Sequence, residues 1–179
     1  VAITPEEELQ RILPFLKRFD EVWSDVSPRD AEQVFPPLLS VNTWRPEVAA
    51  IALRSSGHLV NDLSALHDDR NAHICAQTGA ALLIIHAVGL PKVSHTHIFY
   101  QNAIDEMLGF FRDKILLAER AGVPREAIVL DPGIDFAKQA GDNLRIFHQL
   151  DRFEQLGRPL LLPVSRKSVI GEVLGIADP

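Results

Sequence analysis

Short apolar runs alternate with longer segments of mixed character along most of the chain. Each apolar run ends in polar residues, and the runs are LLSV (38–41), HLV (58–60), LLII (82–85), IVL (128–130) and LLLPV (160–164). Runs that are short, apolar throughout and often rich in Val and Ile are typical of strands buried on both faces of a sheet. The pattern therefore predicts five such strands.

The segments between the runs carry the period of an α-helix. Between positions 100 and 121, apolar residues recur at steps of four and three and form one helix face: Ile104, Leu108, Phe111, Ile115 and Ala118. The opening segment begins with a capping box, in which Thr4 and Glu7 bracket Pro5. We expect Gly122 to end the long helix, and Gly157 to end the helix before the last strand.

Alternating strands and helices imply parallel strands joined by right-handed crossovers, in either an open doubly wound sheet or a (β/α) barrel. A Rossmann-type sheet favours a glycine-rich turn after an early strand, and no G-x-G-x-x-G occurs here. Polar residues follow all five runs, as in barrels whose active site gathers residues from several strand ends. The sequence therefore favours an α/β fold of the (β/α) TIM-barrel type. Segment 20–37, which contains Trp23, breaks the alternation and is interpreted as a loop or insertion.

Length and composition indicate one ordinary globular domain covering all 179 residues. The net charge of −6 and the lack of a basic stripe argue against a nucleic-acid partner. The single Cys75 excludes an internal disulfide and fits a reducing, cytoplasmic location. No apolar run approaches the ~20 residues that span a membrane, so we expect no membrane partner.

Asp131-Pro132-Gly133 follows the IVL run and has two interpretations. All three residue types favour turns, so the tripeptide can simply reverse the chain. Alternatively, a carboxylate at a strand end can point into a pocket and accept two parallel hydrogen bonds from an amidine-like pair of donors, as in a pterin or guanine ring. The spacing alone leaves both interpretations open.

Other strand ends also carry polar side chains. Asn61 offers a donor and an acceptor to a ring edge, and Asn42 ends the first run, but each is equally expected to cap a loop. His86 is more often a structural hydrogen-bonding residue than a ligand or base. His95 and His97 lack a third recognisable metal ligand, so we interpret them as part of a solvated loop.

A basic pair lies where the last helix is expected to begin. Lys167 falls near the first turn, where the helix dipole is positive and a cation is mildly unfavourable. The cost is small if the ammonium group meets an anion or a carbonyl, and the backbone N–H groups at the same end would assist an anion. Arg166 and Lys167 therefore suggest an acidic or phosphorylated ligand, against the alternative of a solvated basic pair.

Taken together, five stretches resemble the dihydropteroate synthases, the pterin-binding enzymes of folate synthesis. The stretches are LLSVNTWRPEVA (38–49), LVNDLSAL (59–66), LLIIHAVGLPK (82–92), IVLDPGIDFAK (128–138) and LLLPVSRKSVIG (160–171). They occur in the family's order and with roughly its spacing. The combination of S-R-K-S with L-D-P-G is the most specific part of the resemblance.

The resemblance implies a (β/α) barrel, of which this chain would supply about five of the eight strands. The family's first two strands, with its magnesium ligand, and its last strand would then lie outside this sequence. The implied reaction condenses hydroxymethyl-dihydropterin pyrophosphate with para-aminobenzoate to give dihydropteroate and pyrophosphate, with magnesium as cofactor. The resemblance also implies a homodimer.

Motif matches carry the family's substrate-binding roles to eight positions in this chain. They are Asn42, Asn61, Ile85, Asp131, Phe136, Ser165, Arg166 and Lys167. Asp131 and Asn61 would hold the ring edge, whereas Ile85 and Phe136 would supply apolar contacts. Lys167 would contact the pterin carbonyl and flank the aminobenzoate beside Ser165 and Arg166, and Asp131 and Lys167 are the implied catalytic residues.

Two positions depart from the family's motifs. Asn42 stands where the family's S-x-D-T element has a carboxylate, and Asp135 replaces a glycine of L-D-P-G-x-G-F, where it would add bulk and charge near the ligand. These departures keep open a non-catalytic pterin-binding relative or scaffold. A pterin-dependent methyltransferase is a further alternative, but the S-R-K-S element argues against it because that element would flank an aminobenzoate.

Overall fold

A computed structural model of the chain describes residues 3–26, 37–89 and 98–176. Its α-helices are α1 (Pro5–Val26), α2 (Pro46–Ser55), α3 (Arg70–Thr78), α4 (Ala103–Arg120), α5 (Ala140–His148) and α6 (Ser168–Leu174). Two short 3-10 helices are η1 (Arg125–Ala127) and η2 (Leu150–Leu156). The strands are β1 (Ser40–Asn42), β2 (Leu59–Asp62), β3 (Ala81–Ile85) and β4 (Ile128–Asp131).

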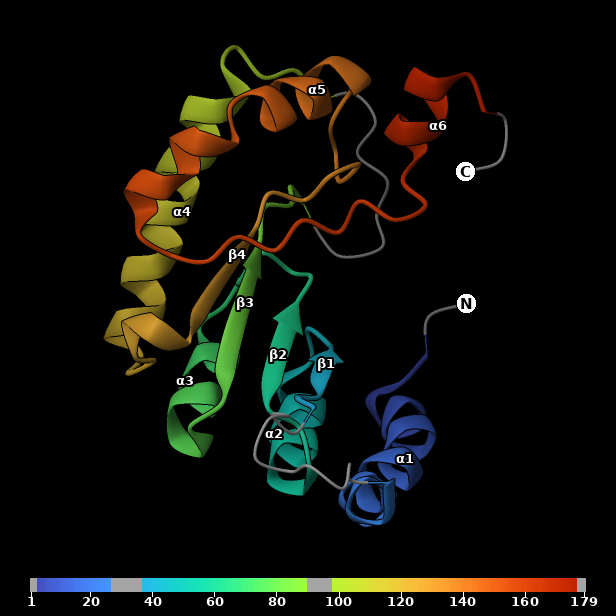
Figure 1. The fold of residues 1–179 in the computed structure, drawn as a ribbon. Helices are drawn as coiled ribbons and strands as arrows, with labels where there is room; N and C mark the ends of the chain where they lie inside the picture. Colours follow the sequence, from blue (N-terminus) through green and yellow to red (C-terminus); the bar gives the residue numbers. More distant parts are fainter. Residues whose placement is uncertain (1–2, 27–36, 90–97, 177–179) are drawn as a thin grey trace.

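The four strands form one parallel sheet in the order β1-β2-β3-β4, which is also their order along the chain (Figure 1). A doubly wound sheet reverses its strand order at a switch point, whereas consecutive units of a (β/α) barrel add strands in one direction. The order found here is that of barrel units, so the predicted α/β fold of barrel type is confirmed. Figure 1 also shows α5 and α6 beyond the arrowheads, at the carboxyl ends of the strands.

The prediction of a fifth strand at 160–164 is wrong. The segment touches the sheet only through a parallel bridge between Leu160 and Leu130. The Leu130 N–H donates to the Pro159 carbonyl at 2.9 Å, and the Leu161 N–H donates to the Leu130 carbonyl at 2.7 Å. Pro163 then offers no N–H to continue a ladder, which explains why pairing stops. The described residues therefore hold four strands rather than five.

Helix α1 begins as predicted but extends further than the sequence suggested. The Thr4 N–H donates to Glu7 Oε2 at 2.9 Å, and the Glu7 N–H donates to the Thr4 hydroxyl at 3.2 Å, which completes the capping box. Residues 20–26, with Trp23, are helical and not part of a loop, because they contain neither Gly nor Pro to end the helix. The rest of the proposed insertion, 27–36, lies outside the described residues.

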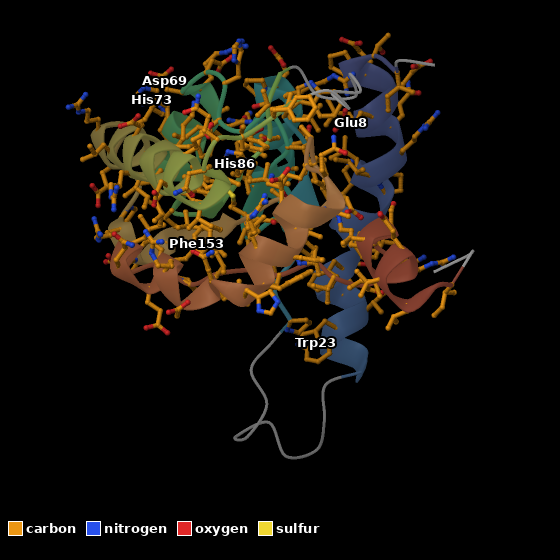
Figure 2. The ribbon with its side chains drawn as sticks, turned by 90° about the horizontal axis from the view of Figure 1, so that it is seen from above. Glu8, Trp23, Asp69, His73, His86 and Phe153 are labelled. Carbon is orange, nitrogen blue, oxygen red and sulfur yellow. The ribbon has the colours of Figure 1, made fainter. Side chains whose placement is uncertain are left out.

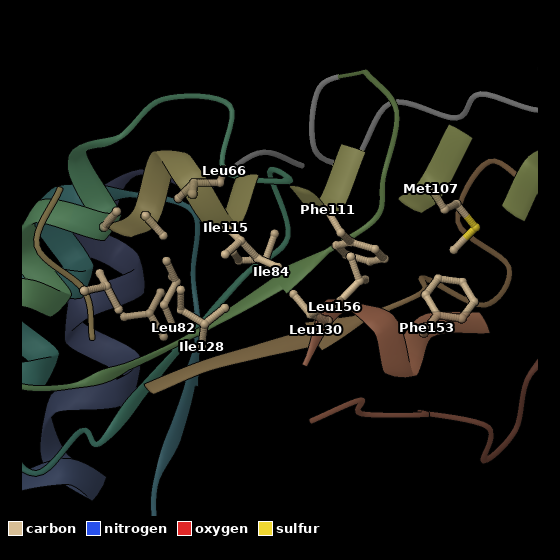
Figure 3. Packing of buried hydrophobic residues seen from close by; sticks show 14 of the residues in the cluster. Leu66, Leu82, Ile84, Met107, Phe111, Ile115, Ile128, Leu130, Phe153 and Leu156 are labelled. Carbon is tan, nitrogen blue, oxygen red and sulfur yellow. The ribbon is translucent and has the colours of Figure 1, made fainter. Parts of the chain in front are cut away.

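Most of the core lies between one face of the sheet and helices α2 to α5. Strands β3 and β4 contribute Leu82, Ile84, Ile128 and Leu130 (Figure 3). Helix α4 contributes Phe111 and Ile115 from the face that its periodicity predicted, together with Met107. The rings of Phe111 and Phe153 meet edge to face with their centroids 6.1 Å apart. A second, smaller cluster joins Leu16 of α1 to Val41 of β1 and Ala52 of α2.

Candidate functional site

The alternation of side chains along β3 and β4 separates a core face from a second face. Ile84 and Leu130 belong to the core that the helices cover. Successive side chains of a strand point to opposite faces, so the following residues, Ile85 and Asp131, turn away from those helices. The register pairs Ile85 directly with Asp131. Two predicted site residues are therefore neighbours on one face of the sheet at its carboxyl edge.

The same face carries both predicted asparagines. Val60 packs into the helix-covered core, so Asn61 turns to the other face, where the register pairs it with Asn42 and Leu83. Leu83 lies two residues before Ile85 and shares its face. Among the described residues, Asn61 Oδ1 is a buried acceptor with no hydrogen-bond partner, whereas Asn42 is exposed. Asn61 thus presents an unused acceptor on the face that holds Asp131.

Asp131 is both the turn residue and the buried carboxylate that its two interpretations predicted. Its side chain is only 3% exposed, and Oδ1 accepts a hydrogen bond from the Gly133 N–H at 2.7 Å. Burial raises the pKa of Asp131 above its ordinary value, while the Gly133 N–H and the charges of Lys167 and Lys138 act in the opposite direction. The site therefore holds a carboxylate with two cations near it.

The loop 132–137 after β4 has an unusual backbone. Gly133, Asp135 and Ala137 all have positive φ angles, at 67°, 66° and 52°. A non-glycine residue in the left-handed region costs on the order of 1 kcal/mol, so two of them in one short loop require contacts that hold the loop in place. Two lysine side chains supply some of those contacts.

Lys167 is the first of these lysines, and its contacts explain why a cation lies at the start of a helix. It is the N-cap residue of α6, and its Nζ donates to the Ile134 carbonyl at 2.9 Å and lies 4.9 Å from the centre of the Phe136 ring. The ammonium group thus meets a carbonyl and an aromatic face, as the sequence allowed. Ser165 and Arg166 are exposed directly beside it. Phe136, Asp131 and Lys167 are therefore brought together as predicted.

Lys138 is the second, and sequence reasoning missed it. Its Nζ lies 3.0 Å from His86 Nδ1 and donates to the carbonyls of Gly133 and Phe136 at 3.0 Å and of His86 at 3.2 Å. His86 itself is 4% exposed and is the structural hydrogen-bonding residue that was expected. The sequence offered one signal for Lys138, its position at the end of the IVLDPGIDFAK stretch.

His86 should make the stability of the protein sensitive to acid. Burial, with the nearby charge of Lys138, lowers the pKa of His86 from 6.5 to about 3. Between these values the unfolded chain binds a proton that the folded protein does not, so the free energy of unfolding falls as pH falls through this range. We expect a loss on the order of 4 kcal/mol in urea unfolding. In His86→Gln the free energy of unfolding should depend less steeply on pH. An equally steep dependence in that variant would show that His86 is not the cause.

Asp135 does not lie against the ligand face as its replacement of glycine suggested. Its Oδ1 accepts from Asn143 Nδ2 at 3.0 Å, and its own N–H donates to Asn143 Oδ1 at 3.1 Å. Its Oδ2 accepts from the Val169 N–H at 3.4 Å. The carboxylate is therefore directed to α5 and to the start of α6, where it links the loop 132–137 to the helix that follows Lys167.

The described residues contain no cluster of typical metal-binding side chains. Within residues 3–26, 37–89 and 98–176, no group of three or more His, Cys, Asp or Glu side chains could hold one. His95 and His97 lie outside the described residues. Within the same ranges, the structure contains no helix with the length and apolar character of a membrane span.

The fold and the site define a class of protein. A parallel sheet that grows in chain order, with polar side chains gathered at the carboxyl ends of its strands, is the arrangement of a ligand-binding (β/α) barrel. The buried carboxylate, the unused amide acceptor and the two lysines make that edge a candidate site for a polar ligand.

Comparisons with known proteins agree with this class. A family profile described as pterin binding enzyme matches residues 2–179. The dihydropteroate synthase of Synechocystis sp. is 36% identical over 99% of this chain and 57% of its own length. The dihydropteroate synthase of Thermus thermophilus in complex with 4-aminobenzoate has a TM-score of 0.85 and 34% identity, over 100% of this chain and 63% of that one. The same protein in complex with 6HMPPP has a TM-score of 0.84 and 35% identity, over 97% and 64%.

The chain belongs to the pterin-binding enzyme family. The family predicted from the five sequence stretches is therefore confirmed. The chain spans 57% of the length of the Synechocystis relative, so activity, substrates and partners of the whole protein are taken up as proposals below.

Proposed function

We propose that the protein acts in folate biosynthesis as a dihydropteroate synthase, a transferase that joins hydroxymethyl-dihydropterin pyrophosphate to para-aminobenzoate. The observation that carries the proposal is the buried carboxylate of Asp131, which shares a sheet face with the unpartnered Asn61 Oδ1 and lies near the charge of Lys167. The relatives named dihydropteroate synthase, and the Thermus thermophilus complexes with 4-aminobenzoate and 6HMPPP, support the choice of substrates.

The pterin ring would be held by complementary donors and acceptors. Asp131 in its ionised form accepts two parallel N–H donors from the amidine-like edge of the ring. Asn61 Oδ1 accepts a further N–H, and Asn42 lies beside it at the open end of the same face. Ile85, which pairs with Asp131 in the register, supplies apolar contact against the ring.

Lys167 and its neighbours would hold the second substrate and the developing charge. The Lys167 ammonium group donates to the Ile134 carbonyl and keeps further N–H donors for the pterin carbonyl. The exposed Ser165 and Arg166 lie where the aminobenzoate can approach, and Phe136 offers its ring beneath Lys167. The site can therefore bind one substrate on the sheet face and the other over the basic segment.

The reaction needs no nucleophile from the protein. The amine nitrogen of para-aminobenzoate attacks the exocyclic carbon of the pterin, the bond from that carbon to the pyrophosphate oxygen breaks, and the amine proton leaves to solvent. Pyrophosphate departs with the bonding electrons, and Arg166 and Lys167 offset part of its charge. The described residues contain no group of three or more His, Cys, Asp or Glu side chains for the magnesium that the family resemblance implies, and no step of the reaction is assigned to that ion.

The proposal also covers the assembly, location and partners of the protein. A homodimer is the assembly we propose, and exposed apolar side chains such as Leu38, Phe99 and Leu174 support association. A cytoplasmic location is supported by the free, buried thiol of Cys75. The net charge of −6 supports small molecules rather than nucleic acid as partners.

Lys167→Ala tests the proposed binding role directly. Titration calorimetry with hydroxymethyl-dihydropterin pyrophosphate should show binding by the unmodified chain, and the variant should bind at least about 10-fold more weakly because a charged hydrogen bond is lost. Its melting temperature should fall by only a few degrees. Lys17→Ala, an exposed lysine of α1, is the matched control and should bind as the unmodified chain does.

The outcomes separate the proposed synthase from its alternatives. Binding followed by release of pyrophosphate and formation of dihydropteroate supports the synthase. Pterin binding without condensation would leave a non-catalytic relative, and demethylation of a methyl-folate by a corrinoid acceptor would identify a methyltransferase. Unchanged affinity in Lys167→Ala, together with a large loss of thermal stability, would overturn the role given to that residue.

A further inference from the structure

Lys138 is a buried cation to which neither the motif matches nor the proposed reaction gives a role. It lies between the loop 132–137 and the end of β3, where His86 occupies the middle of the fold (Figure 2). Burying a lysine is costly unless its charge and its N–H groups are matched. Its surroundings show how they are matched.

The ammonium group of Lys138 has three N–H donors and four acceptors around it. Two acceptors are loop carbonyls, those of Gly133 and Phe136, each at 3.0 Å. The other two belong to His86, with Nδ1 at 3.0 Å and the carbonyl oxygen at 3.2 Å. Because the pKa of His86 is lowered to about 3, its imidazole is neutral and Nδ1 accepts from the ammonium group. One side chain thus ties the loop to the neighbouring strand.

The loop needs such a tie because its backbone makes one internal hydrogen bond, from the Phe136 N–H to the Gly133 carbonyl at 3.0 Å, and is strained elsewhere. Gly133, Asp135 and Ala137 adopt the left-handed conformation, and Asp135 and Ala137 do so at a steric cost. Lys167 donates to the Ile134 carbonyl, and Lys138 donates to the carbonyls of Gly133 and Phe136. The shape of the loop between Asp131 and Phe136 therefore depends on both lysines.

We propose that Lys138 is a positioning residue of the pterin site: its ammonium group ties the loop 132–137 to the end of β3 and sets the charge environment of Asp131. This role rests on the proposed function, because it concerns how Asp131 is prepared to receive the ring. Lys138 itself acts through the loop and through Asp131 and does not touch the reacting atoms.

The charges around Lys138 come from three elements. Asp131 ends β4 and Asp142 lies on α5, and both carboxylates favour the charged lysine, whereas Lys167 at the start of α6 disfavours it. Burial is the larger influence and lowers the pKa of Lys138 to about 7. His86, at the end of β3, is neutral and adds no charge. The Asp131 carboxylate is therefore the charged partner that the lysine shares with the ligand.

The charge of Lys138 should therefore affect ligand binding through the protonation of Asp131. Burial raises the pKa of Asp131, and the positive charge of Lys138 opposes that rise. Without this charge the pKa of Asp131 rises further, so Asp131 is protonated at a higher pH and loses its ability to accept two N–H donors. At high pH the carboxylate is ionised with or without Lys138, and the difference disappears.

Two variants separate the tie from the charge. Lys138→Gln keeps N–H donors without the charge, and Lys138→Met removes both. Affinity for hydroxymethyl-dihydropterin pyrophosphate is measured by calorimetry between about pH 5 and pH 9, a range that spans the titration of Lys138. We expect Lys138→Gln to bind about 10-fold more weakly at the acidic end and to converge on the unmodified chain at the alkaline end. Lys138→Met, which also lacks the donors that tie the loop, should stay weaker across the whole range. Lys114→Met, which removes a lysine that donates to the Leu66 carbonyl, should leave the profile unchanged.

A ligand-free measurement keeps this inference separate from the proposed function. Carbon NMR of the Asp131 carboxyl group reports its pKa directly, and we expect that pKa to be higher in Lys138→Gln than in the unmodified chain. If the unmodified chain binds no pterin, the proposed function fails while this readout still tests Lys138. A uniform loss of affinity at every pH in Lys138→Gln, or an unchanged pKa of Asp131, would reduce Lys138 to a purely structural residue and overturn the inference.

Discussion

Asp131→Asn is expected to weaken binding of hydroxymethyl-dihydropterin pyrophosphate by about 100-fold without unfolding the protein. The carboxylate accepts two parallel charge-assisted hydrogen bonds, which together contribute about 3 kcal/mol, or two powers of ten in affinity. An amide keeps one oxygen, which can still accept from the Gly133 N–H, but it turns an NH2 group toward a ligand edge that also donates. Titration calorimetry at neutral pH measures the loss, and circular dichroism shows that the fold remains.

Asp142→Asn is the matched control for that change. Asp142 is also a buried carboxylate, at 6% exposure, but it lies on α5 and accepts from Arg145 at 3.0 Å and from the Gln139 N–H at 3.2 Å. Neutralising it removes cap and ion-pair contacts, so stability should fall. At alkaline pH, where the charge of Lys138 no longer affects Asp131, pterin affinity should stay within about a factor of two. Equal losses of affinity in both variants would mean that buried charge in general, and not the ring contact of Asp131, supports binding.

The strand ends were predictable because parallel strands share one edge. Four apolar runs ended within two residues of strand ends, and the register then brought Asn42 beside Asn61 and Ile85 beside Asp131. Alternation placed these four side chains on one face without further assumption, since Val60, Ile84 and Leu130 occupy the other. Local patterns therefore determined both the edge and the face of the candidate site.

The errors arose where a local pattern depends on a tertiary partner. Residues 160–164 are as apolar as a strand, but Pro163 removes a donor and the segment leaves the sheet after one bridge. Residues 20–26 look like a loop beside the polar segment that follows them, but the helix begun by the capping box runs through them. The periodicity of apolar residues alone does not show where a strand stops pairing or how far a helix extends.

Lys138 was missed for a different physical reason. A lysine in a turn-rich stretch is ordinarily a solvated residue, and nothing in its neighbours along the chain announces burial. Its acceptors are carbonyls of the loop and both acceptor groups of His86, which lies 52 positions away in the sequence. Only the packing of β3 beside β4 makes the lysine a link between them. Asp135 is similar, because its partners Asn143 and Val169 come from two later helices.

Gly133→Ala is expected to lower the free energy of unfolding by about 3 kcal/mol or more and to weaken pterin binding with it. Gly133 has a φ of 67°, where alanine pays a conformational cost of about 1 kcal/mol. A Cβ at this position would also overlap the carbonyl oxygen of His86. That oxygen accepts from Lys138, and the Gly133 N–H donates to Asp131, so the backbone shift that relieves the overlap must disturb both contacts. Urea unfolding measures the first effect and calorimetry the second.

Gly141→Ala isolates the geometric cause of that loss. Gly141 lies in α5, has no positive φ, and an added Cβ would meet no atom within 4 Å. Alanine is the better helix former by up to about 1 kcal/mol, so this variant should be as stable as the unmodified chain or more so. Gly133→Ala protein that kept full stability would show that the loop 132–137 and the end of β3 can separate freely. The link through Lys138 and His86 would then have no role in placing Asp131.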